Sequence, residues 1–374
     1  MAYQIGVYYF GNYHVDPRNE AVHGPGWTEW ELVKQARPRF PGHQQPKVPL
    51  WGYEDEADPV AMARKIAAAA DHAITHFIFD WYWYNDGPFL NRALEQGFLH
   101  AANNDRLKFT LMWANHDWVD IHPQKRSSPC PLLYPGPVTR QTFNTVADYV
   151  IETYFRHPSY WKLKGCPVFS FYELMTLMRG LGGVEATRDA LESFRAKTRQ
   201  AGFPDLHLNA VVWGVQILPT EQTITDPAHL LAALGFDSVT SYVWIHHVRM
   251  PSFPLTPYDD VREEAAAHWE RARNQYGLPY HPNVTMGWDS SPRTVQSDVF
   301  TNSGYPFTPI LAGNTPARFE VALHQAKAFL DRDAQQPKIL TVNAWNEWTE
   351  GSYLEPDTVN GMGYLEAIRR VFGE

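Results

Sequence analysis

Short apolar runs alternate with longer amphipathic stretches along this chain. The apolar runs have the length of β-strands and cover residues 5–10, 76–83, 107–115, 167–173, 206–214, 238–244, 282–288 and 339–345. Apolar residues recur with helical spacing near residues 59–73, 89–103, 138–156, 184–201, 226–234, 258–276, 316–333 and 362–372. A strand followed by a helix, repeated eight times, predicts a parallel sheet closed into a (β/α)8 TIM barrel, as a single catalytic domain over residues 1–374.

An open, doubly wound sheet is the alternative fold. Such sheets usually carry a glycine-rich turn after the first strand, and this chain has none there. Long segments follow the predicted strands at residues 11–58, 116–137, 245–257 and 289–315, whereas returns such as 202–206 are short. Because the loops after the strands build the active site of a barrel enzyme, this asymmetry favours a catalytic barrel with long βα loops.

The composition narrows the possible partners. The net charge is −9, and a nucleic-acid partner would need clustered Lys and Arg, so we expect none. No apolar run of about 18 residues marks a membrane span. No charged-then-apolar leader opens the chain, which predicts a cytoplasmic location unless a leader has been removed. Cys130 and Cys166 lack CxxC spacing, so we expect free thiols, and we expect no cofactor. Nothing in the pattern indicates an oligomeric state.

Aromatic residues make up 14% of the chain, with 14 Trp and 19 Tyr. Aromatic rings stack on the apolar faces of sugars, and Tyr O–H and Trp N–H groups supply hydrogen bonds. Many of these residues stand beside Asp, Asn, Glu or His where predicted strands end. We therefore expect an oligosaccharide or polysaccharide substrate. The candidate substrate-binding residues are Tyr8, Trp27, Glu29, Asp80, Trp81, Trp113, Asn115, His116, Glu173, Tyr242, His246, Trp288, Asn346 and Trp348.

Two glutamates follow the last predicted strand and are the candidate catalytic residues. Hydrolysis of a glycosidic bond usually needs two carboxyl groups, one of which protonates the leaving oxygen. Glu347 and Glu350 can converge if their segment makes one helical turn. Their mutual repulsion, with burial beside Trp345 and Trp348, would raise one pKa and keep that group protonated near neutral pH. A pair of solvated surface glutamates is the alternative interpretation.

The adjacent histidines His246 and His247 raise the question of a metal site, with Asp289 or Glu173 as a third ligand. Neighbouring residues on a strand point to opposite faces, so two such histidines rarely bind one ion. We therefore expect no metal, and a hydrogen bond to a substrate hydroxyl from one of the two.

Several motifs resemble the WbsX-like proteins, which are relatives of glycoside hydrolase family 99. The most specific is NAWNEWTEGSYLEPD at residues 343–357. The others are YYF at 8–10, GWTEW at 26–30, WAN at 113–115 and YFRHPSYWKLKGCPV at 154–168. Together they run along most of the chain, and the resemblance supports the barrel fold.

Family 99 comprises endo-acting α-mannosidases and α-mannanases that retain the anomeric configuration. The resemblance implies that Glu347 acts as a base on the sugar's own 2-hydroxyl, which attacks the anomeric carbon and gives a 1,2-anhydro sugar. It implies that Glu350 protonates the leaving group and then activates water. This route needs a 2-hydroxyl trans to the leaving group, as in α-mannosides and α-rhamnosides. Thr349 stands where the mannosidases carry His, and His116-Asp117 where WbsX-like sequences more often show Glu-Asn, so the sugar specificity is open.

The leading hypothesis is therefore a retaining α-glycoside hydrolase that acts on mannose- or rhamnose-containing glycans. A glycosyltransferase or transglycosylase of bacterial surface-polysaccharide assembly is the alternative, since WbsX-like proteins are often labelled in that way. The chain has no glycine-rich phosphate loop to hold a nucleotide-sugar. A carbohydrate-binding barrel without catalysis is a third hypothesis, which the presence of both glutamates makes less attractive.

Overall fold

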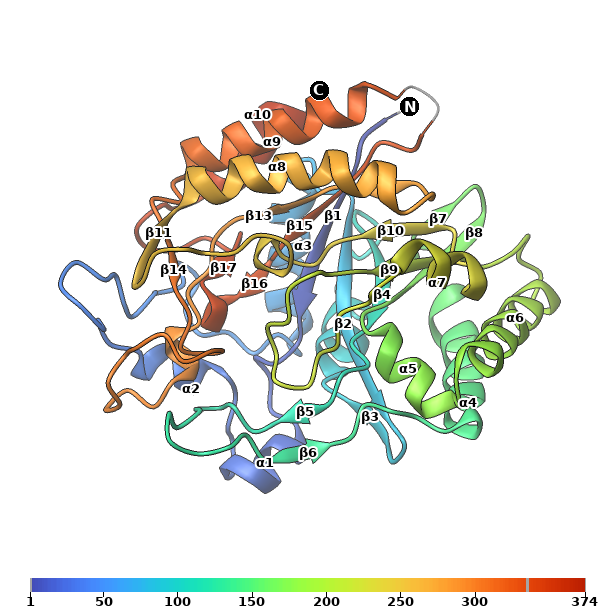
Figure 1. Ribbon diagram of the computed structural model, residues 1–374, viewed down its shortest axis with the longest axis horizontal. Coiled ribbons are helices and arrows are strands. Elements are labelled where there is room, and N and C mark those ends of the chain that lie inside the picture. The colour runs from blue at the N-terminus through green and yellow to red at the C-terminus, as the bar shows by residue number, and fades with distance from the viewer. Residues whose placement is uncertain (1, 334–335, 374) are drawn as a thin grey trace.

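The structure, a computed structural model, describes residues 2–333 and 336–373. Its central feature is a parallel sheet in which neighbouring strands follow one another in the sequence (Figure 1). The strands are β1 (Gln4–Phe10), β2 (His76–Tyr84), β4 (Lys108–Trp113), β8 (Cys166–Phe171), β9 (His207–Val211), β10 (Ser238–Thr240), β12 (Tyr280–His281), β13 (Asn283–Thr285) and β15 (Ile339–Asn343). They coincide with the eight predicted strands, except that the seventh strand of the barrel is split into β12, which precedes the predicted range 282–288, and β13, which lies within it.

The sheet closes on itself through this split strand. β12 pairs with β10, β13 pairs with β15, and Pro282 alone separates the two halves. Because proline has no backbone N–H, the ladder of hydrogen bonds changes partner at that residue. The Pro282 carbonyl still accepts a bond of 3.0 Å from the Thr341 N–H. The predicted TIM barrel is confirmed.

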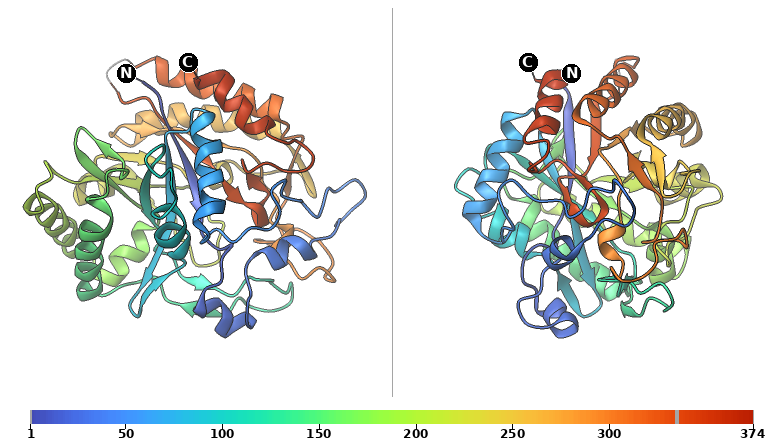
Figure 2. Two further views of the ribbon diagram at one scale, coloured as in Figure 1. Left: turned by 180° about the vertical axis from the view of Figure 1, so that it is seen from behind. Right: turned by 90° about the vertical axis from the view of Figure 1, so that its left-hand side faces the viewer.

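Helices pack around the outside of the strands (Figure 2). The longer ones are α3 (Pro59–Asp71), α4 (Arg140–Val150), α6 (Val184–Gln200), α7 (Pro227–Leu234), α8 (Tyr258–Gln275), α9 (Pro316–Asp331) and α10 (Gly363–Phe372). Several of these helices begin at a residue type that commonly caps helices. The side chains of Asp58, Thr139, Asp226 and Thr315 each accept a backbone N–H of the first helical turn. A proline follows three of these caps, where its missing N–H costs nothing.

Two helical segments differ from the sequence prediction. The predicted helix at 89–103 is a short π-helix, Ala93–Phe98, flanked by turns. Gly97 lets this segment lie against the first long loop, because an added Cβ would collide with the Glu56 carbonyl oxygen. The short helix α5 (Leu174–Leu181), which ends at Gly182 with a φ of 97°, was not predicted. Its apolar sequence merges with the end of the preceding strand.

The long loops after the strands contain short elements of their own. These are α1 (Pro17–His23), α2 (Trp30–Gln35), β3 (Gly87–Phe89), β5 (Trp118–Val119), β6 (Leu132–Tyr134), β11 (Leu255–Pro257) and β14 (Ile310–Ala312). α1, α2, β3, β5 and β6 gather at the bottom of Figure 1, and the two chain ends lie at the top. Among the described residues, no helix is long and apolar enough to cross a membrane. The barrel thus presents one loop-rich end, where a site is expected.

Candidate active site

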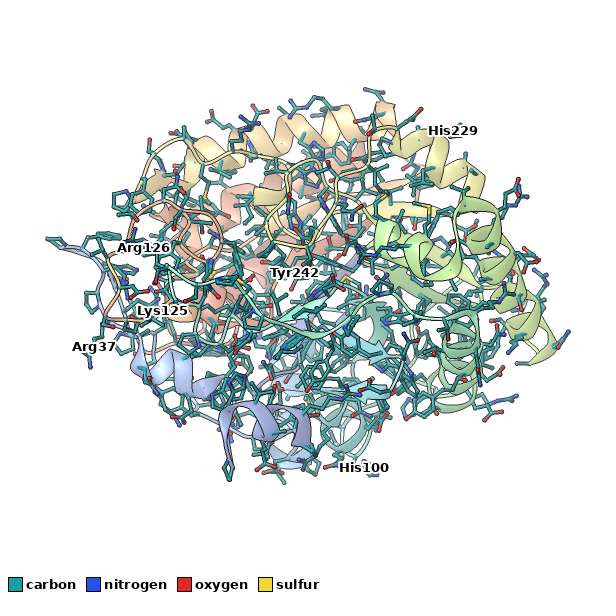
Figure 3. The ribbon with its side chains drawn as sticks, turned by 60° about the horizontal axis from the view of Figure 1, so that its bottom comes forward. Arg37, His100, Lys125, Arg126, His229 and Tyr242 are labelled. Atoms are coloured by element: carbon teal, nitrogen blue, oxygen red, sulfur yellow. The ribbon has the colours of Figure 1, made fainter. Side chains whose placement is uncertain are left out.

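A pocket opens where the barrel strands finish and the long loops gather. Its walls combine aromatic rings with carboxylates, histidines and one arginine. The lining residues are Phe10, Asp80, Tyr82, Met112, Ala114, His116, Asp117, Trp118, Val119, Ile121, His122, Tyr172, Ile217, Leu218, Tyr242, Val243, His246, Trp288, Arg293, Glu347 and Glu350. Tyr242 is labelled near the centre of Figure 3, in which the loop-rich end is turned toward the viewer. Rings beside hydrogen-bonding groups suit a sugar, which offers both C–H faces and hydroxyls.

Glu347 and Glu350 stand on a tight loop after the last barrel strand. β16 (Asn346–Glu347) pairs with β17 (Ser352–Tyr353) in an antiparallel hairpin. A single 3-10 turn, Trp348–Glu350, joins the two short strands. This turn brings both carboxylates to the pocket, as their spacing in the sequence predicts.

The loop has little freedom to move. Gly351 closes it with a φ of 65°, and an added Cβ would lie 2.6 Å from the Asp289 Cβ, so a larger residue would force the turn apart. The Asn346 side chain accepts a bond of 2.8 Å from the Phe10 N–H and donates one of 2.7 Å to the Phe10 carbonyl. The loop that carries Glu347 and Glu350 is thereby tied to the first barrel strand.

Glu355 supports the same loop from behind. Its carboxylate accepts bonds from the indole N–H groups of Trp345, at 3.0 Å, and Trp348, at 2.7 Å. Lys65 on α3 completes the cluster with an Nζ–Oε1 distance of 2.5 Å. The Trp348 ring also stacks on Tyr353, with ring centroids 3.8 Å apart. Trp348 therefore positions the loop and does not line the pocket.

Arg293, in the loop after β13, joins the two glutamates. Its Nη1 lies 2.5 Å from Glu350 Oε1, and its Nη2 lies 3.2 Å from Glu347 Oε2. Its Nε lies 2.8 Å from a third carboxylate, Glu29 Oε1. All four side chains are buried. Because the guanidinium is planar and rigid, it fixes the two glutamates on neighbouring nitrogens of one cation.

Two tyrosines contact the glutamate pair. The Tyr305 hydroxyl donates a bond of 2.7 Å to Glu350 Oε1 and also contacts Arg293. The Tyr242 hydroxyl lies 2.8 Å from Asp80 Oδ2 and 3.3 Å from Glu347 Oε1. Glu350 therefore has the shorter contacts with donors, whereas Glu347 shares its tyrosine with another buried acid.

These surroundings shift the pKa values of the pair in the same direction. Burial, and then the charge of Glu350, raise the pKa of Glu347 well above its usual range against the effect of Arg293. Burial also raises the pKa of Glu350, opposed by Arg293 and by the bond from Tyr305. The sequence led us to expect one raised pKa, and the structure raises both. The contacts with Tyr305 and Arg293 favour the ionised form of Glu350.

Glu29 is the acid that stays charged behind the pair. Burial opposes its ionisation, but Arg293 and His122 hold the pKa of Glu29 below its usual range. Thr349 contributes a hydroxyl bond of 2.5 Å to Glu29 Oε1. Trp27, two residues earlier, stacks on the ring of His23 with centroids 4.2 Å apart. Glu29 and Trp27 thus contribute to the walls around the site without lining the pocket.

Asp80 behaves differently from Glu29. Burial, and then the charge of Glu350, raise the pKa of Asp80 well above its usual range, despite the bond from Tyr242. Its Oδ1 has no hydrogen-bond partner within the described part of the chain. Asp80 therefore lies in the pocket wall with one carboxyl oxygen that has no partner among the described residues.

The structure brings some of the residues predicted from the sequence into the pocket lining and leaves others outside it. Those in the lining are Asp80, His116, Tyr242, His246, Trp288, Glu347 and Glu350. Those outside it are Tyr8, Trp27, Glu29, Trp81, Trp113, Asn115, Glu173, Asn346 and Trp348.

The alternation of side chains along strands explains two of these differences. Successive residues of a strand point to opposite faces, so only every second residue can reach the barrel interior. Asp80 lines the pocket, whereas Trp81 points outward and lies 3.3 Å from the Tyr154 hydroxyl through its Nε1. Trp113 likewise points outward and donates to the Trp83 carbonyl at 3.2 Å.

Three further residues have structural contacts at the strand ends. Asn115 and Glu173 exchange two hydrogen bonds, of 2.7 and 2.8 Å, which join the ends of β4 and β8. Tyr8 donates to the Ser241 carbonyl at 3.2 Å, and its ring lies 4.7 Å from that of Tyr242. These residues support the pocket wall from below or beside it.

The adjacent histidines have separate surroundings. His246 lines the pocket, and its Nε2 lies 3.6 Å from Glu221 Oε1. His247 stacks on His268 with centroids 3.8 Å apart, and burial holds the pKa of His247 well below its usual value. Asp289 is bound instead by His43, with an Nε2–Oδ2 distance of 2.8 Å. The structure does not bring these groups together around one point.

Sequence reasoning missed Arg293 and Tyr305, which hold the glutamate pair. Both lie in the long loop after the seventh strand, within a run rich in Ser, Pro and Thr. One arginine and one tyrosine in such a loop carry no local pattern that distinguishes them. Their role follows from where the loop folds.

A buried carboxylate pair at the carboxyl ends of the strands, in a closed (β/α)8 barrel, is the arrangement of a glycoside hydrolase-type TIM barrel. Solved structures agree on the fold. A GH99 endo-alpha-mannosidase from Bacteroides thetaiotaomicron superposes with a TM-score of 0.58 at 13% identity, over 99% of this chain and 96% of its own. A protein described as glycoside hydrolase-like superposes with a TM-score of 0.64 at 15% identity, over 100% of this chain and 94% of its own.

The chain belongs to the WbsX family. The family model described as "Glycosyltransferase WbsX" matches residues 5–368, which confirms the resemblance seen in the sequence motifs. Among curated proteins, the uncharacterized protein WxcX of Xanthomonas campestris pv. campestris strain B100 is 28% identical over 97% of this chain. The WxcX protein of strain ATCC 33913 matches to the same extent. The chain spans about half the length of these curated relatives, 49% in each case.

Proposed function

We propose that this chain hydrolyses α-glycosidic bonds in mannose- or rhamnose-containing glycans and retains the anomeric configuration. One observation carries the proposal: Glu347 and Glu350 lie on neighbouring nitrogens of Arg293 in an aromatic-lined pocket. Glycosidases generally use two carboxyl groups that flank the bond to be broken. The likeness of the fold to endo-α-mannosidase structures supports the same assignment.

The proposed reaction has two displacements at the anomeric carbon. Glu347 removes the proton of the substrate's 2-hydroxyl, and that oxygen attacks the anomeric carbon as the bond to the leaving oxygen breaks. Glu350 gives its proton to the leaving oxygen. Glu350 then takes a proton from water, which opens the 1,2-anhydro ring at the anomeric carbon, and Glu347 returns its proton to the 2-oxygen. Two inversions give net retention.

The first displacement needs a charged Glu347 and a protonated Glu350. In the free site, the short contacts of Glu350 with Tyr305 and Arg293 favour the ionised form of Glu350 instead. A substrate 2-hydroxyl that donates a hydrogen bond to Glu347 favours its ionised form. We infer that binding of the glycan shifts the shared proton from Glu347 to Glu350, so that the pair becomes active when the sugar is in place.

Substitution of each glutamate tests these roles. Glu350→Gln should lose turnover on natural glycans and much less on an activated aryl glycoside, whose leaving group needs no proton. Glu347→Gln should lose both, because ring closure has lost its base. Glu31→Gln, on an exposed glutamate of α2, is the matched control and should keep wild-type rates. The opposite pattern for the two variants would exchange their roles, and wild-type rates in either would remove that residue from the mechanism.

The anomer that forms first is the direct test of retention. Proton NMR of wild-type protein with a panel of α-mannosyl and α-rhamnosyl substrates should show the α-anomer first. An inverted product would mean that another carboxylate holds a water on the far face of the sugar. Asp80 would then be the first residue to test, because it lines the pocket and Glu173 does not. The absence of turnover across the panel would count against hydrolysis of these sugars.

Glycosyl transfer is the second candidate, because the family carries that name. A nucleotide-sugar donor brings a pyrophosphate that needs cations or free backbone N–H groups. Among the described lining residues, Arg293 is the one Lys or Arg, and its three nitrogens already hold carboxylates. The pocket is therefore better suited to a glycan than to a nucleotide-sugar. Incubation with nucleotide-sugar donors in place of glycans separates the two activities.

A further inference from the structure

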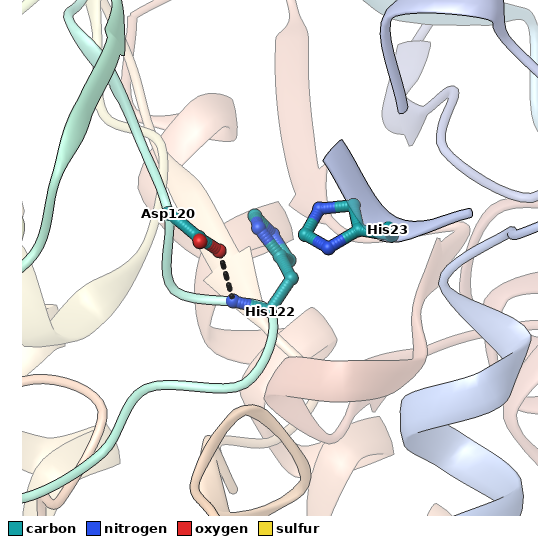
Figure 4. A group of neighbouring side chains, drawn as sticks. All are labelled: His23, Asp120 and His122. Carbon is teal, nitrogen blue, oxygen red and sulfur yellow. Dashed lines mark hydrogen bonds between the residues drawn. The ribbon is translucent and has the colours of Figure 1, made fainter. Parts of the chain in front are cut away.

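Three side chains with metal-binding groups meet beside the candidate active site. His23 is the last residue of α1, in the loop after the first barrel strand. Asp120 and His122 follow β5, in the loop after the third barrel strand. One ligand atom of each lies within 4.8 Å of those of the other two. Figure 4 shows the His122 ring between the Asp120 carboxylate and the His23 ring.

The nitrogen and oxygen atoms of these three side chains take part in few hydrogen bonds with the described residues. The Nδ1 of His122 has no partner among the described residues, although the side chain is only 4% exposed. Its Nε2 lies 3.9 Å from Glu29 Oε2, beyond hydrogen-bond distance. The Asp120 carboxylate receives one long bond, of 3.4 Å from the His122 N–H. A buried ring nitrogen without a partner costs free energy unless a ligand fills the place.

A neutral histidine ring carries a lone pair on one nitrogen, which can bind a metal ion. The half-buried His23 and Asp120 leave a route from solvent to the group.

We propose that His23, Asp120 and His122 bind one divalent transition-metal ion of the Zn²⁺ class. Two imidazole nitrogens and one carboxylate oxygen suit zinc and its neighbours, whereas Ca²⁺ and Mg²⁺ prefer a shell made only of oxygen atoms. Three protein ligands leave the fourth tetrahedral position for water. The sequence-based metal hypothesis concerned His246 and His247 and does not include this group.

The ion would join two loops at the entrance to the pocket. Ligand atoms around tetrahedral zinc lie about 3.4 Å apart, given bonds of about 2.0–2.1 Å. The ligand atoms lie within 4.8 Å of one another in the structure, so one bound ion would tie the first loop to the third. His122 lines the pocket and stacks on Trp118, with ring centroids 5.4 Å apart. Metal binding would therefore hold one wall of the pocket in place.

This inference does not rest on the proposed hydrolase activity, and its test needs no substrate. Chelator-treated protein is titrated with ZnCl₂ in a calorimeter and with CoCl₂ while the visible absorption of bound Co²⁺ is followed. We expect one ion per chain and an increase of the melting temperature with Zn²⁺. His23→Gln and Asp120→Asn change partly exposed residues, so both variants should fold. Each should weaken Zn²⁺ binding by more than about tenfold and lose the Zn²⁺-dependent increase.

His229→Gln is the matched control, because His229 is an exposed histidine on α7 at the edge of the molecule in Figure 3. It should bind Zn²⁺ as the wild type does. The melting temperature of each metal-free variant checks that the fold is intact. The proposal fails if the wild type binds no ion, if His23→Gln and Asp120→Asn bind as tightly as the wild type, or if His229→Gln loses binding to the same extent.

Discussion

Replacement of Arg293 by methionine tests the electrostatic account of the site. The guanidinium is buried and contacts Glu29, Glu347 and Glu350 at 2.8, 3.2 and 2.5 Å. Methionine fills much of the same volume but leaves the carboxylates without their cation. Removal of one partner from a buried ion pair costs about 3–5 kcal/mol, because the remaining charge is buried and unpaired. We expect a loss of this size in the free energy of unfolding at about pH 8.

The pH dependence of that loss identifies its cause. Without the cation, the pKa values of Glu347 and Glu350 rise further and the pKa of Glu29 is held down less, so the folded variant retains about one proton more than the wild type. A folded-state pKa that is raised above the unfolded value lowers stability as the pH rises between the two values. One additional proton changes the free energy of unfolding by about 1.4 kcal/mol per pH unit. The loss should therefore shrink by up to about 4 kcal/mol between pH 8 and pH 5.

Urea unfolding followed by fluorescence at both pH values measures the effect. Arg195→Met is the matched control, because Arg195 is also buried but pairs with the partly exposed Asp237 at 2.7 Å. Its loss of stability should be nearly equal at the two pH values. The double variant Glu29→Gln/Arg293→Met should recover part of the stability, since one unpaired charge is gone. A loss under about 1 kcal/mol at pH 8, or an equal loss at both values, would refute this reasoning.

Two further predictions concern the supports of the site. Glu355→Gln leaves Lys65 buried without its anion and should lower the free energy of unfolding by about 3–5 kcal/mol. Its control, Arg64→Met, breaks a half-exposed ion pair and should change the free energy of unfolding by about 1 kcal/mol or less. Similar losses in the two variants would contradict the role of Glu355. Burial, with the charge of Glu221, raises the pKa of Glu173 to about 7, so the wild type loses stability as the pH rises from about 4 to 7. Glu173→Gln should gain up to about 3 kcal/mol over the wild type across that range, measured by urea unfolding, and a gain that does not grow with pH would oppose the assignment.

The barrel could be predicted because its strands are local in the sequence. Each is a short apolar run with a turn or cap at its ends, and each pairs with the next along the chain. The structure of the segment 89–103 was harder to predict, because the close approach of Gly97 to Glu56 depends on a loop that is distant in the sequence. The seventh strand was predicted to begin at Pro282, so β12 on the other side of that proline was not predicted.

The sequence predicted the acidic residues of the site more fully than the residues that hold them in place and shift their pKa values. Glu347 and Glu350 stand out because they follow a strand and lie three residues apart. Asp80 and Trp81 were both predicted to bind substrate, and only the direction of each side chain in the structure separates them. Arg293 reaches the pair from another loop, so its role depends on tertiary structure that no local pattern records.

The wall of the barrel changes its hydrogen-bonding partner at the split seventh strand, between β12 and β13, and we call this place the seam. β10 and β12 share two register pairs, and β13 and β15 share three, whereas β2 and β4 share six. Arg293 follows the split strand, and its glutamate partners follow β15, so their ion pairs lie beside the seam. The groups proposed for catalysis thus also hold β13 and β15 together at the open end of the barrel. Any event that parts them, such as proton uptake or the entry of a sugar, would remove these ion pairs from the junction of β13 and β15.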